Sequence, residues 1–208
     1  MKPLEILKIL KFPDPKLRRK CKPVGKVTPE LKEFAQRMLE TMYSFKGIGL
    51  AAAQVDRLDR LIVVDTRRPE GDDKEARYEL GGETELEKAV SQPLILINPV
   101  IKKKEGKTTY NEGCLSVPTY FEVVHRALYI EVEALNEEGK KIQIKTDGLL
   151  AICIQHEIDH LDGKLFIDRL SPIKSSRIKS KIKKFGYPDP NSKSEDDEEE
   201  VTEPHREL

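Results

Sequence analysis

The sequence predicts an α+β domain, and three observations support this class. An amphipathic helical pattern follows the N-terminal segment, several short apolar or alternating stretches suit antiparallel strands, and a long apolar helical pattern occupies residues 147–163. Helices and hairpins that occupy separate stretches of the chain are typical of α+β proteins. With 208 residues, the chain has the length of one domain with appendages.

The first helix is predicted at residues 28–45. Thr28 precedes it as a capping residue, and Pro29 occupies its first turn, where a proline has no hydrogen bond to lose. Apolar side chains recur at helical spacing on one face, which is expected to belong to the core. That face consists of Leu31, Phe34, Met38, Met42 and Phe45.

Strands are predicted from short apolar runs and from alternation. Residues 61–64 and 94–97 are apolar runs, and residues 66–92 between them are rich in Glu, Lys, Arg and Gly. This intervening segment is expected to be a long exposed loop whose charges face solvent. Residues 128–134 and 141–145 alternate between apolar and polar side chains around a Gly-containing turn, which predicts a β-hairpin.

The apolar pattern at residues 147–163 organises the chain. Asp147 is placed to cap its free N–H groups, and Gly163 suits the left-handed position that follows a last helical turn. Residues 149–154 are almost entirely apolar, so this helix is expected to be buried. It nevertheless carries polar side chains, which need partners inside a core. These are Gln155, His156, Glu157, Asp159 and His160.

Two of these side chains predict a metal site. His156 and His160 are four residues apart, so both imidazoles project from one face of the helix and can bind one ion. Glu157 lies about 100° further round the helix, within reach of a water on that ion. His-Glu-x-x-His on a helix is a signature of metal hydrolases. The alternative, two hydrogen-bonded core histidines, is disfavoured because the helix boundaries and the buried setting both suit the motif.

A catalytic site of this kind usually has a third protein ligand and one position for water. Downstream, the chain offers Asp168 and then mainly basic residues, while His205 stands in an acidic tail. Upstream, Cys114 lies in the segment 112–118, between a glycine and a nearby proline that predict a shaped turn. A thiolate at Cys114 would complete a Cys-His-His set, although a lone cysteine is more often a small buried side chain.

A second helix is predicted from Ser171 to a stop near Gly186. Its apolar stripe consists of Ile173, Ile178, Ile182 and Phe185. Its polar face carries six cations and no anion, namely Lys174, Arg177, Lys179, Lys181, Lys183 and Lys184. Residues 191–208 hold eight acidic and two basic side chains without a core-forming pattern, which predicts disorder. We therefore expect a main domain at 1–170, a basic helix at 171–187 and an acidic tail at 188–208.

The cysteine count and the apolar runs limit the cellular compartments in which the protein is expected. Three cysteines, an odd number, favour a reducing environment over a disulfide framework. No apolar run reaches the ~20 residues of a membrane span, and the N-terminal apolar run is too short and interrupted for a signal peptide. A cytoplasmic protein without membrane contact is therefore expected.

Three separated motifs occur together in the chain: GIGLAAAQ at 47–54, EGCLSVP at 112–118 and QHEIDHLDG at 155–163. In this order they resemble the peptide deformylase family, and the resemblance extends from about Ile6 to Leu170. It implies antiparallel sheets wrapped around the central helix. It also implies an enzyme that removes the formyl group from the N-terminal methionine of new proteins, so N-formyl-methionyl nascent polypeptides would be its substrates.

The resemblance assigns the metal site by matching position. Cys114, His156 and His160 would be the ligands. Glu157 would be the general acid/base toward a metal-bound water or hydroxide. The family usually holds Fe²⁺, and this ligand set would also accept Zn²⁺, Ni²⁺ or Co²⁺.

The resemblance also assigns the substrate site. Gln54 and the backbone N–H of Leu115 would hold the formyl oxygen, and backbone groups at Ile48 and Gly49 would pair with the substrate backbone. Taken alone, Gln54 is better explained as a surface amide at a tight helix–loop junction. Side chains of the central helix would line the methionine pocket, although a thiol at Cys153 also suits plain core. They are Leu149, Ile152 and Cys153.

Two other functions remain as alternatives, and the sequence differs from the family pattern in two places. An HExxH metalloprotease would need a downstream third ligand, and a structural zinc site would need a fourth ligand, for which Cys21 is the spare cysteine outside the helix. Phe121 stands where some deformylases have an arginine near the substrate path, and the segment 66–92 is longer than in compact members. The basic helix at 171–187 would offer its charge to the ribosome surface, or would simply be solvated.

Overall fold

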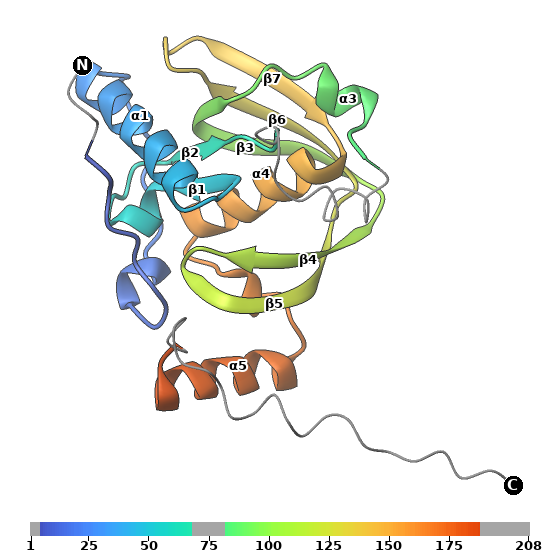
Figure 1. Cartoon of the computed structure of the whole chain (residues 1–208). Helices are drawn as coiled ribbons and strands as arrows, with labels where there is room; N and C mark the ends of the chain where they lie inside the picture. Colours follow the sequence, from blue (N-terminus) through green and yellow to red (C-terminus); the bar gives the residue numbers. More distant parts are fainter. Residues whose placement is uncertain (1–4, 68–81, 188–208) are drawn as a thin grey trace, which may run out of the picture.

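The computed structural model describes residues 5–67 and 82–187 (Figure 1). Its strands form a five-stranded antiparallel sheet in the order β1-β2-β3-β6-β7 and a separate two-stranded hairpin of β4 and β5. The strands are β1 Gly49–Ala51, β2 Leu61–Val64, β3 Leu94–Glu105, β4 Thr108–Cys114, β5 Val117–Arg126, β6 Tyr129–Leu135 and β7 Lys141–Thr146. The α+β class predicted from the sequence is confirmed.

The central helix α4 lies between the five-stranded sheet and the β4–β5 hairpin, as Figure 1 shows. The α-helices are α1 Pro29–Ser44, α3 Glu85–Lys88, α4 Gly148–Leu161 and α5 Pro172–Phe185. Short 3₁₀ helices are η1 Pro15–Arg18, η2 Ala52–Val55 and η3 Phe166–Asp168. None of the helices within 5–67 and 82–187 combines the length and the apolar run that a bilayer crossing requires.

Strand β2 explains how the sheet carries helices on both faces. Ile62 and Val64 pack in one core cluster with α4, whereas Leu61 and Val63 pack in a second cluster with α1. Successive side chains of a strand point to opposite faces, so a strand covered on both sides is apolar throughout. All four side chains are fully buried, and burying one such side chain stabilises the fold by about 1.5–3 kcal/mol.

Helix α1 begins as predicted. The hydroxyl of Thr28 accepts the N–H of Leu31 at 3.2 Å, which satisfies one of the free donors of the first turn. The predicted apolar face is buried from Leu31 to Met42. The prediction is wrong for Phe45, which follows the last turn and is 50% exposed beside a cavity.

The predicted β6–β7 hairpin is confirmed, with Asn136 and Lys140 joined through their backbones across its turn. The β4–β5 hairpin was not predicted, because its exposed face and its polar residues hide the alternation that marks a strand. Cys114 pairs with Val117 at the tip of this hairpin, which confirms the turn expected there.

Two predictions are wrong here: the cap expected from Asp147 at the start of α4, and the exposed loop expected over all of residues 66–92. The side chain of Asp147 does not accept an N–H of the helix, and it accepts the Thr84 hydroxyl instead. Residues 82–92 are not simply an exposed loop, because they contain α3 and bury Glu87 to 3% exposure; residues 68–81 lie outside the described part. At the other end, Gly163 has φ +72°, as predicted for a left-handed helix stop.

Helix α5 begins at the predicted cap, where the hydroxyl of Ser171 accepts the N–H of Lys174. Ile178 and Ile182 pack in a third core cluster with η3 and the β5 side chains Val117 and Val124. The predicted stripe is wrong at its ends, because Ile173 is 83% exposed and Phe185 is 69% exposed. The acidic tail predicted at 188–208 lies outside the described residues.

Candidate metal centre

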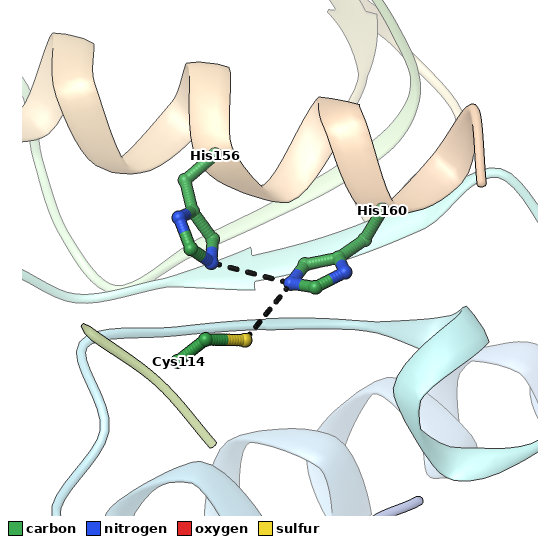
Figure 2. A group of neighbouring side chains, drawn as sticks. All are labelled: Cys114, His156 and His160. Carbon is green, nitrogen blue, oxygen red and sulfur yellow. Dashed lines mark hydrogen bonds between the residues drawn. The ribbon is translucent and has the colours of Figure 1, made fainter. Parts of the chain in front are cut away.

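Three donor atoms converge between α4 and the tip of the β4–β5 hairpin. Figure 2 shows His156 and His160 projecting from one face of α4 toward Cys114. The Nε2 atoms of the two histidines lie 3.2 Å apart, and Sγ of Cys114 lies 3.3 Å from Nε2 of His160. All three donors lie within 4.8 Å of one another. Helical spacing brings the histidines together, and the hairpin brings the cysteine to them.

This donor set suits a divalent ion. Two nitrogen ligands of a tetrahedral ion, each about 2.0–2.1 Å from it, lie roughly 3.3 Å apart, close to the observed separation. Nδ1 of His156 lies 2.7 Å from Oε2 of Glu112, so a proton on Nδ1 leaves Nε2 free to bind the ion. No fourth His, Cys, Asp or Glu joins the cluster in the ranges that the structure covers, so a water position stays open.

A buried ionic network surrounds the histidines. Arg126 donates to both carboxylate oxygens of Glu112, at 2.6 and 2.8 Å, and also to Asp159, which accepts from Arg169 as well. Glu112 and Arg126 are each under 5% exposed. Breaking such a buried pair by removing one partner costs about 3–5 kcal/mol. The network therefore holds His156 in one orientation. It also anchors Asp159, which directly precedes His160 on the same helix.

The pKa values of the two imidazoles are shifted in opposite directions. Burial lowers the pKa of His156, but the hydrogen bonds with Cys114 and Glu112 outweigh burial and raise that pKa well above its usual value. Burial and the charge of His156 lower the pKa of His160 well below its usual value. An ion needs both Nε2 atoms unprotonated, so its binding releases a proton.

Glu157 lies beside the metal-binding donors and is 4% exposed. Burial raises the pKa of its carboxyl to about 7, against the opposing charge of His156. Its Oε2 atom has no hydrogen-bond partner within the described residues. A Cβ on Gly49 would come within 2.7 Å of the sulfur of Cys153 and within 2.9 Å of Cδ of Glu157. Only glycine at position 49 lets β1 approach the carboxylate this closely.

Gln54 is buried at 1% exposure, so the surface amide expected from its local sequence is wrong. Its Oε1 accepts the N–H of Ala51 at 2.8 Å. Its Nε2 donates to the hydroxyl of Ser116 at 3.1 Å and contacts Sγ of Cys114 at 3.6 Å. Ser116 was missed by the sequence analysis, although it lies two residues after the cysteine in the same motif.

A cavity of about 760 Å³ opens at these side chains. Every site residue proposed from the sequence lines it except His160, whose Nε2 contacts the lining residues Cys114 and His156. The carbonyl of Ile48, on its wall, accepts the N–H of Asp65 at 2.9 Å. The lining proposed from the sequence comprises Ile48, Gly49, Gln54, Cys114, Leu115, Leu149, Ile152, Cys153, His156 and Glu157.

Several residues of the cavity mouth were not among the site residues proposed from the sequence, although Phe121 had been placed near the substrate path by the family resemblance. Phe45, Tyr110 and Phe121 supply aromatic surface, and Phe121 covers Gly113 so closely that a Cβ there would lie 2.8 Å from Cδ1 of the ring. The only sign of them in the sequence is an aromatic residue close to a motif. The sequence alone does not distinguish an aromatic side chain that lines a cavity from one that packs in the core. Three lysines also line the mouth: Lys8, Lys11 and Lys46.

Comparisons with known proteins point to one family. The family described as "Polypeptide deformylase" matches residues 6–176. A peptide deformylase of Neisseria gonorrhoeae is 46% identical over 181 residues, which cover 87% of this chain and 96% of that protein.

Solved structures agree. A peptide deformylase from Legionella pneumophila is 40% identical with a TM-score of 0.72, covering 87% of this chain and 95% of that one. A peptide deformylase from Ehrlichia chaffeensis in complex with actinonin is 36% identical with a TM-score of 0.73, covering 86% and 97%. With the fold, the motifs and these relatives in agreement, the chain belongs to the polypeptide deformylase family.

Proposed function

We propose that this enzyme hydrolyses the formyl amide at the N-terminal methionine of new polypeptides, releasing formate and a free α-amine. The observation that carries the proposal is the convergence of Cys114, His156 and His160 next to the buried carboxylate of Glu157, at the wall of one cavity. Three protein ligands with an open fourth position are typical of hydrolytic rather than structural metal sites.

The ligands proposed for the metal are Cys114, His156 and His160. A divalent ion bound there supplies positive charge that polarises the formyl carbonyl and lowers the pKa of a coordinated water toward about 7. Fe²⁺ is the resident ion we propose, with Zn²⁺, Ni²⁺ and Co²⁺ as substitutes. The thiolate adds a soft, negatively charged ligand, which suits these ions better than Mg²⁺ or Ca²⁺.

Glu157 is the proposed proton carrier. Its unpartnered Oε2 is available to accept a proton from the attacking water, and the same carboxyl can deliver that proton to the leaving nitrogen. A pKa near 7 suits both directions of transfer at neutral pH. Such proton transfers typically contribute about 10²- to 10⁴-fold to the rate.

Gln54 and the N–H of Leu115 are the proposed donors to the formyl oxygen. Gln54 is held through its Oε1 atom by Ala51, so its Nε2 is already aimed at the region of Cys114. Negative charge that develops on the formyl oxygen would meet two preplaced donors. Removing one donor of this kind usually costs about 2.7–4 kcal/mol of transition-state stabilisation.

The remaining substrate contacts are proposed from the lining of the cavity. Backbone groups at Ile48 and Gly49 would pair with the peptide, next to the edge of the sheet at β1. Side chains of α4 would enclose the methionine thioether, and small surroundings at the scissile carbon would reject an acetyl group. These pocket side chains are Leu149, Ile152 and Cys153.

Matched formyl and acetyl methionyl tripeptides test the function, with formate and free amine measured separately. Formate release with the acetyl peptide left intact supports the proposal. The rival metalloprotease predicts cleavage inside an unblocked peptide, and that result would overturn the deformylase function. Metal content should be determined on the same preparation, so that lack of activity is not confused with loss of the ion.

The location of the enzyme follows from its substrate. We propose a cytoplasmic enzyme with a catalytic domain at 1–170 and a basic helix at 171–187 that contacts the ribosome surface. Lys174 pairs with Glu122 and Lys179 pairs with Asp168, and the other cations of α5 form no ion pair with a residue in 5–67 or 82–187, which leaves them for a polyanion in this proposal. Cosedimentation with ribosomes should fall steeply with salt, and its absence at low salt would exclude this contact.

A further inference from the structure

Glu87 occupies the position that a capping side chain usually takes at the start of a helix. Its Oε1 accepts the N–H of Leu150 in the first turn of α4 at 2.7 Å. Its Oε2 accepts the N–H of Thr84 at 3.1 Å, and the hydroxyl of Thr84 accepts the N–H of Glu87 at 3.1 Å. This reciprocal capping box fixes the carboxylate of Glu87 within α3 and aims it at α4.

Helix α3 lies near the start of α4 (Figure 1), and its Glu87 side chain is buried there. Gly148 has φ +60°, and a Cβ at this position would lie 2.6 Å from Cδ of Glu87. The absence of a side chain at Gly148 therefore makes room for the carboxylate. The hydroxyl of Thr84 also donates to Asp147, so the residue at the usual cap position is itself bound to α3.

The turn that Glu87 holds leads into the wall of the substrate cavity. Leu149 precedes the bonded N–H, and Ile152 and Cys153 follow it in the next turn, and all three line the cavity. The metal-binding end of α4 has separate supports, because Glu112 holds His156 and Arg126 holds Asp159. Loss of the Glu87 contact should therefore move the pocket end of the helix more than the metal end.

We infer that Glu87 is a positioning residue for the side-chain pocket: through the backbone of Leu150 it sets the place of Leu149 and Ile152, and so the selectivity for the first residue of the substrate. This inference rests on the proposed function. It assigns a role to the segment between β2 and β3, whose C-terminal part carries α3.

The test compares the full-length enzyme with its Glu87→Ala variant on two formyl tripeptides, one beginning with methionine and one with alanine. Methionine fills the pocket and alanine leaves it mostly empty. The ratio of their kcat/KM values should fall roughly three- to tenfold in Glu87→Ala, mainly through KM for the methionine peptide. A displaced pocket wall weakens its contacts without removing them, so the loss stays below the roughly 10- to 200-fold that one whole methylene contact is worth. Bound metal should stay unchanged.

Three further variants separate positioning from general stability. Glu87→Gln retains an amide oxygen for the N–H of Leu150, so it should restore most of the selectivity ratio. Thr84→Val loosens the capping box and should lower the ratio less than Glu87→Ala, and it decides the matter if Glu87→Ala does not fold. Glu85→Ala, on the same helix with a side chain 91% exposed, should leave the ratio unchanged.

The outcomes are distinguishable from a failure of the proposed function. A wild-type enzyme that releases no formate from either peptide would overturn the proposed function itself. Normal wild-type activity with an unchanged ratio in Glu87→Ala and Thr84→Val would overturn only the positioning role, even if the variants melt at lower temperature. Faster hydrogen exchange at the Leu150 amide in Glu87→Ala, with unchanged exchange at residues 156–160, is the expected independent readout.

Discussion

Nδ1 of His156 lies 2.7 Å from Oε2 of Glu112, and Arg126 donates to both oxygens of that carboxylate. Glu112 therefore selects which imidazole nitrogen carries the proton and which one faces the metal site. The chain supplies this carboxylate from the same motif as the cysteine, two residues before Cys114. One strand end thus provides a ligand and the group that orients another ligand.

Substitution Glu112→Gln should weaken metal binding by about 10- to 100-fold, because a Gln side chain orients and polarises the imidazole of His156 less well. It should also lower stability, since Arg126 loses its charged partner. A chelator competition measures the metal affinity, and thermal unfolding reports the stability. The matched control is Glu122→Gln on the same hairpin, whose side chain pairs with Lys174 at the surface. Equal affinity in Glu112→Gln and wild type would contradict the orienting role.

Cys114→Ser and Glu157→Ala should fail in different ways. Cys114→Ser removes a soft ligand, so the purified protein should contain less metal or a different one. Glu157→Ala removes the proton carrier but no ligand, so it should retain metal and lose about 10²- to 10⁴-fold in kcat. Elemental analysis of both variants, alongside their formate release, checks the distinction. Metal-free Glu157→Ala protein would show that the glutamate acts on the ion rather than on a proton.

The lysines at the cavity mouth should favour acidic peptides. Lys8, Lys11 and Lys46 are exposed, and none of them forms an ion pair with a residue in the described ranges. The two carboxylates of the cavity wall, Glu112 and Glu157, are both buried. Formyl-methionyl peptides with aspartate at the third position should have kcat/KM roughly three- to tenfold higher than those with lysine there, and salt should reduce the difference.

Charge reversal at Lys8, Lys11 and Lys46 together should invert this preference. Lys183→Glu on α5, outside the cavity lining, is the control and should keep it. The same ranking of peptides in the triple variant and in wild type would show that the rim charges do not guide the substrate.

Because of Asp168, the stability of the fold should depend on pH in the acidic range. Burial raises the pKa of this carboxyl, but hydrogen bonds from Arg18, from the N–H of Leu165 and from Lys179 outweigh burial and lower it. Because the folded pKa lies below the unfolded one, the stabilisation is complete above the unfolded pKa of about 3.9 and is lost as pH falls through the folded pKa.

Asp168→Asn should therefore be less stable than wild type by about 1–2 kcal/mol at pH 7, and the two should converge in acid. Urea unfolding at several pH values measures the difference. Glu138→Gln, an exposed carboxylate without an ion pair in the ranges described, should match wild type throughout. A constant gap between Asp168→Asn and wild type across all pH values would assign the effect to packing instead of charge.

The sequence by itself determined the elements whose signal is local. The bounds of α1 and α4, the two histidines four residues apart and the β6–β7 hairpin follow from spacing along the chain, because backbone geometry converts spacing into a shared face. Three motifs, compared with a known family, also pointed to Cys114 as the partner of those histidines, and the structure places it beside them.

Tertiary structure alone decided which distant groups became partners. The local sequence of Gln54 predicts a surface amide, but in the fold its side chain is buried and bonded to Ser116 and Ala51. The local sequence predicts Asp147 as the cap of α4, but Glu87 from a different segment accepts the N–H of the first turn. A buried N–H or carboxylate must find a partner, but any suitable donor or acceptor satisfies it. The choice depends on which segments the sheet register brings together, and that register is a property of the whole fold.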